Sequence, residues 1–132
     1  MSVPRYCIKN NLGQVKALSE PIEPKNNLTR VVVDSGICGF HCVVEAWEKE
    51  KRVISVRISG SECKQIQNLS GMVQEMNLRD LFAPVGKNLV FSSAQAAGCH
   101  PTCPVPIAVL KAVEVAMGMA LPKEATIRFE KV

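Results

Sequence analysis

The chain has 132 residues, a net charge of +4 and few aromatic side chains: one Trp, one Tyr and four Phe. Its length suffices for one domain with its own core, and its scattered basic residues and scarce aromatics argue against a nucleic-acid partner. The start of the chain lacks a signal peptide and no span is apolar enough for a bilayer, so we expect a cytoplasmic protein without a membrane partner. In that compartment six cysteines indicate metal binding, redox chemistry or catalysis rather than a disulfide framework.

Residues 1–28 contain three prolines and are expected to form an extended N-terminal arm. Residues 29–132 then make up a single domain. Cys7 lies in the arm with no partner nearby in sequence, and we expect it to be a small, half-buried apolar residue.

Three strands are predicted after the arm. Residues 29–34 are rich in β-branched side chains, residues 40–47 form a second apolar run, and residues 53–59 alternate. A charged turn over residues 48–52 joins the last two, so together they predict an antiparallel meander.

Helices are predicted next. Ser61 is expected to cap a helix that continues to Val73, and shorter helices are expected over residues 78–82 and 91–97. The strongest helix signal covers residues 104–119, with Pro104 at its first position and Gly118 near its end.

After this helix, residues 125–130 alternate as a strand does. The expected fold is therefore α+β. A small, mainly antiparallel sheet, made of the three-strand meander and a C-terminal strand, carries helices packed on one face.

The helix over residues 104–119 is apolar on most of its faces, since only Lys111 and Glu114 carry charge. Such a helix is buried against a sheet, a second layer or a second subunit. A homodimer through residues 104–119 is therefore one expected partner arrangement.

A stretch rich in thiols precedes that helix, with Cys99, His100 and Cys103 held among prolines. The start of a helix favours a thiolate at Cys103. The meander places Cys38 and Cys63 at one end of the sheet. Cys103 joins them if the C-terminal strand runs antiparallel to the helix before it.

Three thiolates with a fourth thiolate or imidazole form a closed ligand set for tetrahedral zinc or for an iron–sulfur cluster. The predicted ligands are Cys38, Cys63 and Cys103, with Cys99 or His100 as the fourth. Gly36 and Gly39 flank Cys38 and are predicted to let the backbone approach a bound cofactor closely. The alternative is that these cysteines are reduced and act as small hydrophobic residues.

His41 and Cys42 are neighbours in the second strand, so they lie on opposite faces of the sheet. Cys42 is expected in the core, and His41 is not predicted as a ligand. Motifs of hydrolases, metalloproteases and nucleotide-binding enzymes are absent from the sequence. A Cys103–His100 nucleophile pair would lack an orienting carboxylate, so we expect a binding protein in preference to an enzyme.

Cys103-Pro104-Val105-Pro106, with Lys111 beyond it, resembles the Cys-Pro-x-Pro helix start of TusA/SirA-type sulfur carriers. This resemblance implies that Cys103 carries a persulfide, and Cys99 would then resolve it.

Over residues 29–131 the chain also resembles a family of small, uncharacterised prokaryotic proteins. The shared motifs are Gly36-Ile37-Cys38-Gly39-Phe40, Cys63 at a helix start, and His100-Pro101-Thr102-Cys103-Pro104-Val105-Pro106. This resemblance brings no activity, and it implies that Cys38, Cys63, His100 and Cys103 are the residues to test.

Three functions stay open on the sequence. The first is a small metal-binding protein with a structural, redox or metal-delivery role. The second is a persulfide carrier or thiol-redox protein that uses Cys103. The third is a metal-free, dimeric interaction domain. Delivery of metal or sulfur implies a protein partner.

Overall fold

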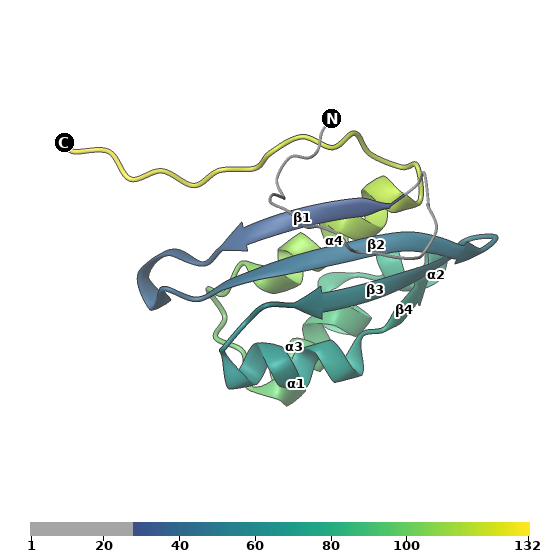
Figure 1. The fold of residues 1–132 in the computed structure, drawn as a ribbon, viewed down its shortest axis with the longest axis horizontal. Helices are drawn as coiled ribbons and strands as arrows, with labels where there is room; N and C mark the ends of the chain where they lie inside the picture. Colours follow the sequence, from purple (N-terminus) through teal and green to yellow (C-terminus); the bar gives the residue numbers. More distant parts are fainter. Residues whose placement is uncertain (1–27) are drawn as a thin grey trace, which may run out of the picture.

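A computed structural model describes residues 28–132 of the chain. Cys7 and all of the expected arm except Leu28 lie outside these residues. The described part forms a four-stranded antiparallel sheet, in the order β1-β2-β3-β4, with helices on one face (Figure 1). The predicted α+β fold is confirmed.

The meander consists of β1 (Thr29–Asp34), β2 (His41–Glu50) and β3 (Val53–Ser59), which pair in antiparallel fashion. β2 is longer than predicted because its charged end still pairs with β3, where Glu50 lies opposite Val53. Only two residues remain for the turn. One of them is Arg52, which has a left-handed φ of 61°, and the pairing of β2 with β3 is irregular between Glu48 and Glu50.

Residues 28–132 form four α-helices: α1 (Lys64–Met72), α2 (Leu78–Phe82), α3 (Leu89–Ala97) and α4 (Val105–Ala116). A shorter 3₁₀ turn, Val85–Lys87, connects α2 with α3. Within residues 28–132, no helix has the length and apolarity needed to cross a membrane.

Two helix starts differ from the prediction. Cys63, and not Ser61, directly precedes α1. The Ser61 hydroxyl instead accepts a hydrogen bond from the Cys63 N–H at 3.1 Å. α3 begins at Leu89 because the Asn88 side chain caps it, accepting the Val90 N–H at 2.9 Å.

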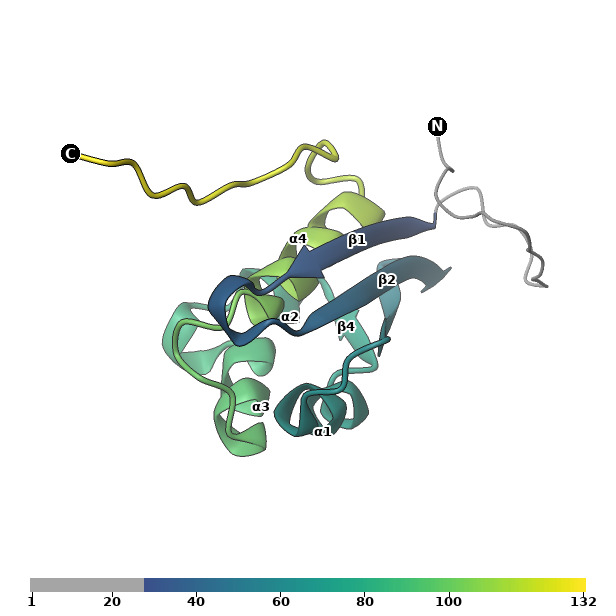
Figure 2. The ribbon, with the colours of Figure 1, turned by 60° about the vertical axis from the view of Figure 1, so that its left-hand side comes forward.

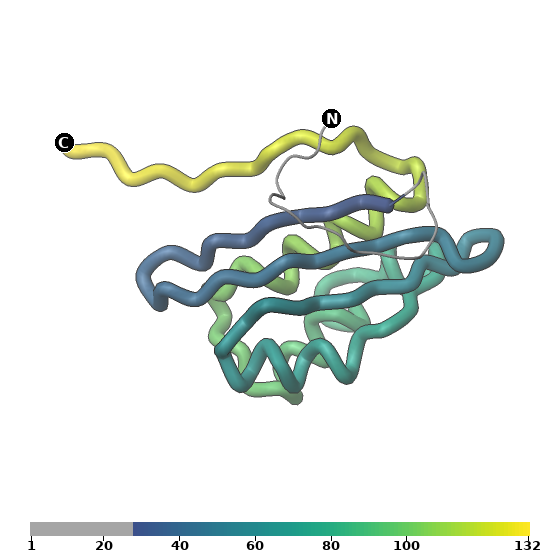
Figure 3. The backbone as a smooth tube through the Cα atoms, viewed as in Figure 1, coloured from purple at the N-terminus to yellow at the C-terminus, as the bar shows by residue number. Residues whose placement is uncertain are grey.

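The fourth strand is β4 (Glu75–Asn77), and the prediction of a C-terminal strand in the sheet is wrong. β4 pairs with β3 and buries Met76. Residues 121–132 form no helix or strand and are exposed, and the tail runs clear of the body (Figure 3). Alternation gives a segment one apolar face, but a strand also requires a neighbouring backbone to pair with.

The core lies between the sheet and its helices (Figure 2). α4 contacts β1, β2 and β3, and buries Val105, Val109 and Val113 completely or nearly so. α1 packs against β3 and α3. Most of the apolar side chains of α4 are thus buried within its own domain.

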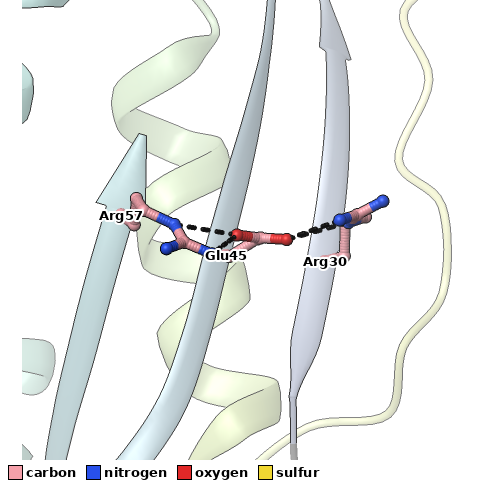
Figure 4. Close-up of polar contacts among 3 residues, drawn as sticks. All are labelled: Arg30, Glu45 and Arg57. Atoms are coloured by element: carbon pink, nitrogen blue, oxygen red, sulfur yellow. Dashed lines mark hydrogen bonds and ion pairs between the residues drawn. The ribbon is translucent and has the colours of Figure 1, made fainter. Parts of the chain in front are cut away.

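The opposite face of the sheet holds a buried carboxylate, because Glu45 is only 4% exposed (Figure 4). Arg30 donates to one of its oxygens at 2.7 and 3.0 Å, and Arg57 donates to the other. The Arg57 guanidinium also lies 5.5 Å from the centre of the Trp47 ring. Burial by itself would raise the pKa of Glu45. Arg57 and Arg30 lower that pKa overall, because they donate hydrogen bonds to the carboxylate and carry positive charge.

Candidate functional site

The cysteines gather at one end of the sheet. The loop after β1, the segment before α1 and the connection from α3 to α4 all lie at the left-hand end of the molecule in Figure 1. They enclose a cavity of about 140 Å³. Five predicted site residues line it: Cys38, Cys63, Cys99, His100 and Cys103.

Cys38 closes the 3₁₀ turn Gly36–Cys38 in the first of these segments. The Gly39 N–H donates to the Gly36 carbonyl at 2.9 Å, and both glycines have left-handed φ angles, of 76° and 85°. A Cβ at either glycine would meet no atom within 4 Å, and neither glycine lines the cavity. The glycines are therefore required by the shape of the turn rather than by close approach to the cavity.

Cys63 lies at the N-cap position of α1, at the exit of β3. Its thiol donates to the Gln65 side-chain oxygen at 3.2 Å. Gln65 also lines the cavity, and the sequence analysis missed it because a neutral amide near a helix start carries no signal of a metal or catalytic site.

Cys99, His100 and Cys103 lie in the connection from α3 to α4. Gly98 ends α3 at a left-handed φ of 82°, and the Cys99 N–H then donates back to Ala94 at 2.9 Å. The Cys103 N–H donates to the His100 carbonyl at 3.0 Å, which makes a tight turn ahead of α4.

The direction of α4 brings Cys103 to this end, because α4 starts here and runs towards the far end of β1 (Figure 1). The prediction that a C-terminal strand brings Cys103 to this end is therefore wrong.

The backbone N–H of Val105, at the start of α4, acts to lower the pKa of the Cys103 thiol. Burial nevertheless raises the pKa of Cys103 above its usual value, and the neighbouring thiols of Cys63 and Cys38 add to the effect. Burial likewise raises the pKa of Cys99, again with help from neighbouring thiols. The expected bias of Cys103 towards a thiolate is thus outweighed, and ionisation of one thiol opposes ionisation of the others.

Two residues of β2 stay outside the cavity. Cys42 is 3% exposed in the core, and burial raises the pKa of its thiol to about 11. His41 is exposed on the other face, with its Nδ1 4.0 Å from Asp34. Both positions agree with the sequence analysis.

A larger, open hollow of about 600 Å³ lies at the other end of the molecule, beside the β2–β3 turn and α2. It contains none of the predicted site residues and no thiol. Its lining is Arg52, Asn77, Leu78, Arg79 and Phe82. The chemistry of the chain therefore concentrates at the smaller cavity.

The donor set of the smaller cavity suits a soft metal, since it offers four thiols and one imidazole. As the side chains lie, no three His, Cys, Asp or Glu residues between Leu28 and Val132 are grouped closely enough to hold a metal ion. The five described cysteines are all free thiols. A metal would therefore have to draw the thiols inward or fill the space between them.

The fold and this cavity define a small α+β protein with a cluster of thiols at one end of its sheet. Residues 29–129 match the model of a family of unknown function (DUF6951), and the chain belongs to that family. Comparison with curated proteins gives no match, and comparison with solved structures gives none either.

Proposed function

We propose that this chain binds a metal centre, an iron–sulfur cluster or zinc, through the thiols that line the cavity. The ligands are Cys38, Cys63 and Cys103, with Cys99 or His100 as the fourth. The observation that carries the proposal is that these side chains come from three separate segments and line one cavity. Cys42, by contrast, is buried in the core and does not line the cavity.

The size of the cavity favours a cluster over a single zinc ion. Its volume of about 140 Å³ is several times the roughly 10–15 Å³ that a cavity needs to hold one water molecule. Zinc binds thiolates at about 2.3 Å and so pulls four sulfurs into contact around one ion. Thiols held apart around a space are better suited to the larger dimensions of a cluster.

The charge of the site supports a cation. Each thiol that ionises makes the next ionisation harder, and a bound metal would remove that cost by coordinating the thiolates. The backbone N–H groups at the starts of α1 and α4 would offset the negative charge of the coordinating thiolates, because both helices begin next to a ligand. The role of such a site would be structural, redox or metal delivery to a protein partner.

The test is an anaerobic purification, with elemental analysis and an absorption spectrum of the same sample. We expect stoichiometric iron and sulfide with visible absorption, or else one zinc per chain without colour. Protein that holds neither metal after reconstitution with iron, sulfide and zinc would refute the proposal.

Single substitutions identify the ligands. Cys38→Ser, Cys63→Ser and Cys103→Ser should each lose most of the bound metal, whereas Cys42→Ala should keep it. Cys42→Ala is the matched control because it removes a cysteine that does not line the cavity. Comparison of Cys99→Ser with His100→Ala then shows which residue is the fourth ligand.

The second candidate is a sulfur carrier that uses Cys103, whose position at the start of α4, beside the Val105 N–H, acts to lower its pKa. Its thiolate would take the outer sulfur from a desulfurase persulfide, and the desulfurase thiolate would leave. The Cys99 thiol could then attack the Cys103 persulfide, forming a disulfide and releasing hydrogen sulfide. A mass increase of one sulfur on Cys103 after incubation with a desulfurase supports this role, and unmodified Cys103 refutes it.

The third candidate, a metal-free dimer through residues 104–119, depends on the part of α4 that its own sheet leaves uncovered. Ile107 is the large apolar side chain there, at 45% exposure. Ile107→Lys should convert such a dimer to a monomer in light scattering. A cytoplasmic location remains part of the proposal, since free thiols persist in reducing compartments.

A further inference from the structure

The C-terminal tail has the side-chain pattern of a strand but pairs with no strand among the described residues. Residues 121–132 are exposed throughout, and Ile127 and Phe129 are 89% and 95% exposed. These two side chains alternate with Thr126, Arg128 and Glu130. A pair of large apolar side chains left in water costs free energy, so this face requires a cover.

The sheet offers an edge that fits such a segment. β1 is an outer strand and pairs only with β2 among the described residues. Val33 faces the helices and is buried, whereas Val32 faces the other way and is 65% exposed. Open strand edges of this length are places where another chain can add a strand.

We infer that residues 125–130 of a second copy of this chain pair with β1, and that the exchange is mutual. Each chain then supplies one free strand and one free edge, which is the self-complementary arrangement that closes a two-fold dimer. The tail leaves the end of α4, passes along the open side of β1 without pairing with it, and extends beyond the sheet (Figures 1 and 2).

The side chains are complementary in this arrangement. In an antiparallel register that places Phe129 beside Val31 and Ile127 beside Val33, both apolar side chains extend the core-facing side of the sheet. The same register places Glu130 opposite Arg30 on the other side. Residues 125–130 thereby pair as a strand with the other chain rather than within their own.

Light scattering coupled to size exclusion tests the inference on the full chain. We expect a dimer for the wild type and a monomer for the double variant Ile127→Ser/Phe129→Ser. The dimer Kd should rise by about a hundredfold or more, because each dimer loses two copies of each contact. Leu121→Ser is the matched control, since Leu121 is 85% exposed but lies outside the pairing segment, and it should remain a dimer.

Thermal unfolding of dilute samples checks that the double variant still folds, as its substitutions lie at exposed positions. A monomeric wild type would overturn the inference. A double variant that stays dimeric would also overturn it and would direct attention to α4. The double variant changes no residue that lines the thiol cavity, so its metal content is expected to equal that of the wild type.

Discussion

Glu45 shows how a single buried charge makes stability depend on pH. The pKa of Glu45 is lower in the folded protein than its usual value of 4.5. At pH values above 4.5 the ionised carboxylate therefore stabilises the fold. This stabilisation is lost as the pH falls through the lowered pKa of the folded state. We expect Glu45→Gln to lower the free energy of unfolding at pH 7 by about 1–3 kcal/mol, since charged hydrogen bonds are lost. Urea unfolding, followed by the fluorescence of Trp47, measures the effect.

The same variant should lose less stability than the wild type between pH 5 and pH 3, because it has no carboxylate to protonate at this position. Glu62→Gln, at an exposed glutamate, is the control and should behave as the wild type does. Parallel pH profiles for Glu45→Gln and the wild type would contradict this account of the carboxylate.

Cys103 provides a second test at the scale of one residue. Because burial raises the pKa of its thiol, the rate of alkylation by iodoacetamide in the metal-free protein should keep rising above pH 9.0, the usual value. Mass spectrometry of peptides after short exposures gives this rate. A plateau below pH 8 would show instead that the start of α4 dominates, as a sulfur carrier would require.

Two asparagines at helix starts differ in burial, and this difference predicts their contributions at the scale of elements. Asn88 is 3% exposed, and its amide also donates to the Asp80 and Ala83 carbonyls at 3.2 Å, which ties α2 to α3. Asn77 caps α2 in solvent and forms a reciprocal pair with Asp80. We expect Asn88→Ala to cost about 2–4 kcal/mol of unfolding free energy and Asn77→Ala about 1 kcal/mol.

Urea unfolding at pH 7 measures both variants, and equal slopes against denaturant ensure that the comparison is of stability alone. Equal losses of unfolding free energy in the two variants would mean that the hydrogen bonds from Asn88 to the Asp80 and Ala83 carbonyls do not add to stability.

The elements that the sequence predicts well are those whose signal is local. The β-branched run of β1 and the alternation of β3 give their bounds, and Pro84 closes α2 at the predicted place. β4 escaped prediction because three residues with one buried side chain, Met76, cannot show a period. The tail was assigned to the sheet because its pattern is correct for a strand, while a sequence does not state which backbone lies beside it.

In the candidate site, too, some positions follow from local sequence signals and others depend on packing. The meander alone brings Cys38 and Cys63 to one end of the sheet, since antiparallel strands reverse direction at each turn. The position of Cys103 depends on how α4 lies across the sheet, which is a matter of packing. The raised pKa of Cys103 depends on burial, which a helix-start argument does not include.

At the scale of the whole molecule, metal binding should couple to stability. A metal at one hundred times its Kd adds about 2.7 kcal/mol to the folded state, which corresponds to a rise of about 10 °C or more in Tm for a domain of this size. We expect this rise on adding the bound metal to metal-free wild type and Cys42→Ala, each compared with its own metal-free Tm, and none for Cys63→Ser. Differential scanning calorimetry under anaerobic conditions provides the measurement.

The rise should shrink as pH falls from 8 to 6, because protons compete with the metal for thiols that ionise with difficulty. An unchanged Tm of the wild type at saturating metal would show that the metal does not bind the folded state more tightly than the unfolded state.

The three segments that enclose the cavity also determine when it can exist in a newly made chain. The loop with Cys38 and the start of α1 are synthesised well before α4, and domains complete their packing only once their last elements are available. The wall that carries Cys103 is therefore the last part of the cavity to become available. Until translation passes α4, the earlier cysteines stay open to oxygen and peroxide, so a nascent chain is most vulnerable to oxidation before its cavity can take up anything.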